Sequence, residues 1–120
     1  QTQPLVLYLM YKIKKGMIRM PKLVAAAIKF KPKGCEYFQI MCDKRHCNVL
    51  EMMYKLGIEY EKLTAVQGFL TEDDQFVDRY DAAQMAFHSG QMKKDTDIYE
   101  KMCKDTEFIN AHALFSEDVW

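Results

Sequence analysis

The sequence lacks the features that would place it in several large classes of protein. Leu5–Met10 is apolar but far shorter than the ~20 residues of a membrane span, so no membrane partner is expected. There is no fixed-period repeat or low-complexity tract, and 49% hydrophobic with 28% charged residues is an ordinary globular composition. We therefore expect an N-terminal extension or extra strand over residues 1–20 and a single folded domain over residues 21–120.

The sequence also lacks the short motifs of common catalytic sites. No GxSxG, P-loop, HExxH or paired CxxC motif is present, and His46, His88 and His112 are scattered without an obvious nucleophile nearby. Cys47 follows His46, but adjacency in sequence does not make a catalytic dyad. These absences favour a binding protein with no catalytic residue and no cofactor over an enzyme.

The cysteines form no recognisable disulfide or metal-binding framework. A chain of this length can build a core without disulfides, so free thiols in a cytosolic protein are expected. Cys42 and Cys47 flank His46, but no second Cys/His pair follows nearby. A zinc site is therefore not predicted.

Net charge is zero, but the charges are unevenly distributed. Residues 1–35 contain eight Lys and Arg and no acid, whereas residues 36–120 contain nine basic and seventeen acidic residues. A basic edge strand, an anion-binding face and a head-to-tail subunit contact all fit this asymmetry. Because the rest of the chain is acidic, long nucleic acid is not expected as a partner.

Several stretches show the alternation or the flanking turns that are typical of strands. They are Lys22–Lys31, Tyr37–Cys42, Ala65–Leu70 and Gln75–Asp78, with a further candidate at residues 5–14. In the first of them, strict alternation would place Val24, Ala26, Ile28 and Phe30 on one face of the sheet.

Capping residues predict two helices. Asp43 is expected to cap a helix over roughly Lys44–Leu56, which Gly57 would end. Asp78 is expected to cap a second helix, which would end at Gly90.

The remaining segments are more polar. Residues 91–110 are predicted to hold a short helix over Asp97–Cys103 or a mobile lid, and Leu114–Trp120 a final strand or a tucked tail. Together these elements predict an α+β fold. It would have an antiparallel β-sheet of four to six strands with two α-helices on one face.

Arg79 fits its predicted position worst. It lies in the first turn of the second helix, where positive charge opposes the helix dipole, and on the same stripe as Ala83. A salt bridge to Asp118, Glu117 or Asp78 would satisfy it. A phosphate held by the guanidinium and the free amides of the helix N-terminus would do so equally.

A second candidate lies at the start of the first helix, where Arg45 precedes His46. His46 also lies on the apolar stripe of that helix, so a core histidine is the alternative. Phe69 or Phe115 would stack on a nucleobase, which contributes about 1–3 kcal/mol per base, unless both are core residues. Asp118 offers an acceptor for ribose hydroxyls or belongs to a solvated tail.

Four segments together resemble a known family. They are AAAIKF, RHCNVLEMM, QGFLTEDDQFVDRYDAAQMAFHSGQ and LFSEDVW, and they span Leu23–Trp120 apart from residues 92–110. Their order is similar to that of the phage anti-defence proteins that block Thoeris immunity. Gln75 departs from the pattern, because a basic residue is expected there and one charge of the pocket is then missing.

The resemblance implies a sponge that acts in the host cytoplasm. Such proteins hold a cyclic ADP-ribose-type signal or a cyclic oligonucleotide without cleaving it, and they assemble as dimers or hexamers. Arg45, His46 and Arg79 would contact the phosphates, and Phe115 or Phe69 the adenine. A protein-binding inhibitor with an acidic surface and a small phosphodiester hydrolase are the alternatives.

Overall fold

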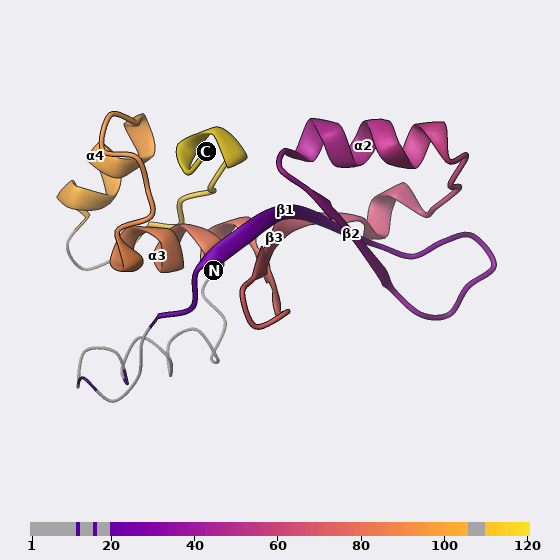
Figure 1. Cartoon of the computed structure of the whole chain (residues 1–120), viewed down its shortest axis with the longest axis horizontal. Coiled ribbons are helices and arrows are strands. Elements are labelled where there is room, and N and C mark those ends of the chain that lie inside the picture. Colours follow the sequence, from indigo (N-terminus) through magenta and orange to yellow (C-terminus); the bar gives the residue numbers. More distant parts are fainter. Residues whose placement is uncertain (1–11, 13–15, 17–19, 106–109) are drawn as a thin grey trace.

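The computed structural model describes residues 12, 16, 20–105 and 110–120 (Figure 1). Four antiparallel strands form one sheet in the order β2-β1-β3-β4. The strands are β1 (Leu23–Phe30), β2 (Gln39–Asp43), β3 (Val66–Thr71) and β4 (Phe76–Asp78). The helices are α2 (His46–Lys55), α3 (Arg79–Ser89) and α4 (Asp97–Lys104), with 3₁₀ turns η1 (Lys62–Thr64) and η2 (Ser116–Asp118). The α+β prediction is confirmed, whereas the strand predicted at residues 5–14 lies almost entirely outside the described residues.

β1 is a central strand of the sheet, paired with β2 on one side and β3 on the other. The interpretation of the basic N-terminal third as an edge strand is therefore wrong for this element. A bulge interrupts its pairing, because Leu23 pairs with Thr71 but Ala25 with Leu70. Leu23 is consequently buried and Val24 is 52% exposed, the reverse of what strict alternation predicts.

The helix-covered face of the sheet holds two separate clusters of buried side chains, here named the large core and the small core. The large core joins α3, α4 and the C-terminal segment to β1, β3 and β4, with Phe69 fully buried within it. The small core lies under α2 and contains Ile28, Phe30, Val49 and Met53. Figure 1 shows the elements that cover the two cores, with α2 toward one end of the long β1 strand and α3 and α4 toward the other.

The two sheet-covering helices begin differently. The side chain of Asp78 accepts hydrogen bonds from two backbone amides in the first turn of α3, and Gly90 ends that helix at φ 78°, as predicted. The predicted cap of α2 is wrong. Asp43 is still the last residue of β2, so the N-cap position falls to Arg45, whose side chain makes no capping hydrogen bond.

The segment after α3 returns to the sheet instead of forming a lid. Thr96 caps α4, which confirms the predicted short helix. Leu114–Trp120, here named the tail, contains η2 and no strand, so the tucked-tail alternative is the correct one. Its backbone is anchored by hydrogen bonds from Leu114 N to Arg79 O (3.1 Å) and from Lys93 N to Asp118 O (2.8 Å). The tail is therefore held beside the N-terminus of α3.

Candidate functional site

The tail meets the N-termini of α2 and α3 at one place, here named the tail junction, which consists of the tail with Arg45, His46 and Arg79. Arg45 Nη2 donates to the carbonyl oxygen of Trp120 at 2.8 Å, and its Nη1 lies 3.5 Å from Glu117 Oε1. The carboxylate is 69% exposed, so this ion pair is weak. Arg45 is thus directed at the tail and only loosely neutralised.

His46 is the core-facing member of the junction. Its Nε2 donates to the carbonyl oxygen of Gly68 at 2.7 Å, and its ring meets Phe69 edge-on at a centroid distance of 5.1 Å. Burial lowers the pKa of His46, the hydrogen bond to Gly68 opposes this, and the charge of Arg79 lowers it further. His46 is only 7% exposed and Phe69 is fully buried, so neither ring presents a face to a ligand in this conformation.

Gly68 allows β3 and β4 to approach each other at this point. A Cβ atom at this position would collide with the carbonyl oxygen of Val77 and lie 2.6 Å from a ring carbon of Phe76. The glycine of the QGF segment is therefore needed for close strand packing, a role that the sequence pattern did not reveal.

Arg79 contacts a neutral amide and an aromatic ring instead of a carboxylate. Its Nη2 donates to the side-chain oxygen of Gln67, and its guanidinium carbon lies 4.6 Å from the centroid of the Phe115 ring. In the described part of the chain, its Nε is buried with no hydrogen-bond partner, and the three salt bridges weighed from the sequence are not formed. Asp78 instead caps α3, and Asp118 accepts from the backbone of Phe115 at 2.9 Å. Arg79 therefore keeps its charge without a carboxylate beside it in the described part of the chain.

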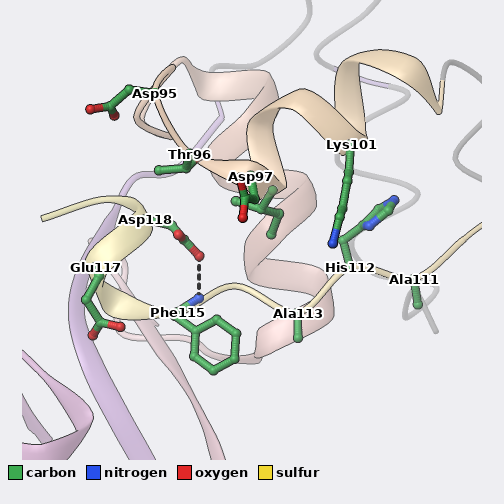
Figure 2. A pocket seen from close by; sticks show the side chains of 11 residues that line it. Asp95, Thr96, Asp97, Lys101, Ala111, His112, Ala113, Phe115, Glu117 and Asp118 are labelled. Carbon is green, nitrogen blue, oxygen red and sulfur yellow. Dashed lines mark hydrogen bonds between the residues drawn. The ribbon is translucent and has the colours of Figure 1, made fainter.

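A cavity of about 690 Å³ opens between α4 and the tail (Figure 2). Phe115, 47% exposed, forms part of its wall, so the ring on which Arg79 stacks also borders this space. Figure 2 shows Lys101 extending from α4 toward the tail beside His112. The acidic side chains that line the cavity are Asp95, Asp97, Glu117 and Asp118.

The arrangement suits a polar ligand with a flat ring. An exposed aromatic side chain with a guanidinium against it accepts a stacked base, and carboxylates accept hydrogen bonds from sugar hydroxyls. Lys101 supplies positive charge on the α4 side of the cavity, and His112 lies 3.2 Å from the carboxylate of Asp105. The tail junction thus includes Arg45, His46, Arg79, Phe115 and Asp118, five of the six predicted site residues. The sixth, Phe69, is buried against the ring of His46.

Sequence reasoning missed the residues contributed by α4. Lys101 lies one helical turn after Asp97, which places both on one face of a short helix. The spacing of Asp97 and Lys101 is visible in the sequence. Their position beside the tail depends on the fold, which the sequence pattern does not show. Gln67, the partner of Arg79, lies in the QGF segment and had been given no role.

A sequence model of the phage T4 y16D protein family matches residues 22–120. The chain belongs to this family. It is thereby a member of a phage protein family, although the family name states no activity and does not specify the anti-Thoeris proteins that the sequence resembles. The matched range includes every strand, α2 to α4 and the whole tail junction of this y16D-family chain. No curated protein and no solved structure shows a significant match.

Three further features concern the described residues of this family member. None of their helices has the length and apolar character needed to cross a bilayer. His, Cys, Asp and Glu side chains form no cluster of three or more that could hold a metal ion within the described ranges. All four cysteines are free thiols. Cys35 is partly buried, and the other three are exposed.

Proposed function

We propose that this phage protein binds and sequesters a cyclic nucleotide signal in the host cytoplasm without cleaving it. The observation that carries the proposal is the contact of Arg79 with Phe115, whose ring forms part of the wall of the cavity. Because no carboxylate pairs with the guanidinium among the described residues, its positive charge favours a phosphate bound nearby. The exposed ring beside it suits an adenine base.

The charges of the cavity narrow the class of ligand. Four carboxylates face one lysine and one histidine, so a ligand with many phosphates would be repelled from most of the cavity. Ribose hydroxyls, in contrast, would find acceptors at Asp97 and Glu117. This balance favours a cyclic ADP-ribose isomer, with its two phosphates and its free hydroxyls, over cyclic oligonucleotides that carry more phosphates.

The two arginines have different roles in this proposal. The side chain of Arg79 donates a hydrogen bond to the neutral amide of Gln67. In this proposal Arg79 binds the first phosphate of the ligand. Arg45 is held by the carbonyl of Trp120 and loosely by Glu117, so it joins the second phosphate only when Glu117 moves aside. The exposed Glu117 side chain can do so at little cost.

Calorimetric titration with cyclic ADP-ribose isomers tests the proposal. We expect binding tighter than about 100 µM, or −5.5 kcal/mol, and the absence of heat at that level would contradict it. Phe115→Leu should weaken binding about tenfold or more, since stacking on one base contributes about 1–3 kcal/mol. Phe38→Leu is the matched control, because Phe38 is also 47% exposed but lies on the opposite sheet face.

The fate of the ligand separates sequestration from hydrolysis. Mass spectrometry after heat denaturation of the complex should recover the cyclic ligand unchanged. Recovery of an opened product would show that the chain is a phosphodiester hydrolase instead. Arg79→Gln should lower affinity in the first case without changing the identity of the recovered molecule.

A further inference from the structure

β2 is an unprotected edge of the sheet. Among the described residues it pairs only with β1, and four of its five residues are exposed. It contains no lysine, arginine or proline, which are the residues that commonly prevent edge strands from pairing. The other edge, β4, has only three residues and continues directly into α3. The exposed hydrogen-bonding groups of the sheet are therefore concentrated along β2.

Apolar surface adjoins this edge on both faces of the sheet. On the face without α2, Ile40 is 44% exposed beside its paired neighbour Lys29, and Val66 on the next strand is 41% exposed. On the face with α2, a groove of about 420 Å³ runs past Phe30, Met41 and Ile58. A strand added to β2 would gain backbone hydrogen bonds and places for side chains above and below.

The charges that flank β2 identify the occupant. Glu36 precedes the strand and Lys44 follows it, and both are exposed. When a strand pairs antiparallel with a copy of itself, the start of one strand meets the end of the other. Each Glu36 then approaches the Lys44 of the partner. This pairing is centred on Ile40, and it places the only charge within the strand, Asp43, opposite the uncharged Tyr37.

We propose that two copies of this chain associate through antiparallel pairing of their β2 strands about a two-fold axis near Ile40. The two four-stranded sheets then form one continuous sheet, and the two grooves meet across the axis. The interface is isologous, so the same patch serves both copies and the assembly closes as a dimer. This inference does not depend on the proposed ligand, since it uses none of the residues of the tail junction.

Sedimentation equilibrium of the full chain tests the proposal. We expect a mass of about twice the 14.1 kDa of one chain. Ile40→Lys places a charge on the exposed edge and should give monomers, whereas Val24→Lys, at a 52% exposed β1 position outside this interface, should leave the dimer intact. Circular dichroism of both variants verifies that each is folded.

Charge reversal tests the pairing direction. Glu36→Lys and Lys44→Glu should each weaken association about fivefold, because each creates two like-charge contacts, and the double variant should restore it. A monomeric wild type, or an oligomer that Ile40→Lys leaves unchanged, would overturn the proposal. The proposal would also be overturned if the wild-type chain were a monomer that formed a complex only with a different protein.

Discussion

The two ends of the sheet are packed to very different degrees. At the α3 end, the large core includes side chains from three strands, two helices and the tail. At the α2 end, the small core has only four buried side chains, and many large apolar residues stay exposed. These are Tyr37, Phe38, Ile40, Leu50, Tyr54, Leu56, Leu63 and Val66. A single sheet thus carries one end that is complete in itself and one that presents apolar surface to solvent.

The difference shows how a small chain divides its apolar residues between stability and association. Both ends share β1, whose Ala26 lies in the large core and whose Ile28 lies in the small core. The extra apolar residues of the α2 end cannot all be covered by one ten-residue helix. Exposed apolar patches of this kind are typical of interaction surfaces. The α3 end therefore stabilises the fold and carries the candidate ligand site, and the α2 end presents the apolar surface on which the proposed dimer depends.

The largest expected effect comes from deleting a core side chain at each end. Phe69→Ala should lower the free energy of unfolding by about 4 kcal/mol, because a fully buried ring leaves a cavity between strands and tail. Met53→Ala should cost about 2 kcal/mol, since the small core can relax around the gap. Urea denaturation measures both. Equal losses would show that the two clusters act as one core.

A smaller effect is expected from the helix caps. Asp78→Ala should lower the free energy of unfolding by about 1 kcal/mol, because two amides of the first turn of α3 lose their acceptor. Asp43→Ala is the control at the other end and should change it by less than about 0.5 kcal/mol, as Asp43 does not cap α2. A larger loss for Asp43 than for Asp78 would reverse the assignment of caps.

The smallest effect is a pH dependence at the tail junction. The folded pKa of His46 lies below its ordinary value of 6.5, mainly because of burial. Between these two values the unfolded chain binds more protons, so stability is fully present above pH 6.5 and declines as pH falls toward the folded pKa. His46→Gln retains a donor for Gly68 and removes the titration. Its unfolding free energy should vary less with pH than that of the wild type, and parallel curves would contradict this.

Local sequence signals predicted most of the secondary structure. Asp78 and Gly90 marked both ends of α3, because capping depends on residues within one turn. The same reasoning failed at Asp43, since β2 continues through that residue and pairs it with Ala26. The bulge beside Val24 was missed for a related reason. Alternation describes one strand, whereas a bulge is defined by the pairing of two.

The site could be predicted only in part. The helix-start positions of Arg45 and Arg79 follow from local patterns. The contact of Arg79 with Phe115 joins residues far apart in the sequence, and Gln67 reaches Arg79 only because β3 lies beside β4. The burial of Phe69 likewise could not be predicted from the sequence, because an aromatic residue near a strand end occurs both in cores and at binding surfaces.

The bulge in β1 has a consequence for variation in this family. Val24 is the extra residue between Leu23 and Ala25, where regular pairing with β3 begins. Because of this insertion, Leu23 lies on the helix-covered side of the sheet. Removing a single amino acid there would carry Leu23 to the opposite side of the sheet and leave its site in the interior without a side chain. Homologues that change length at this point are therefore expected to do so with a compensating change in Leu23 or in the facing residues of α3.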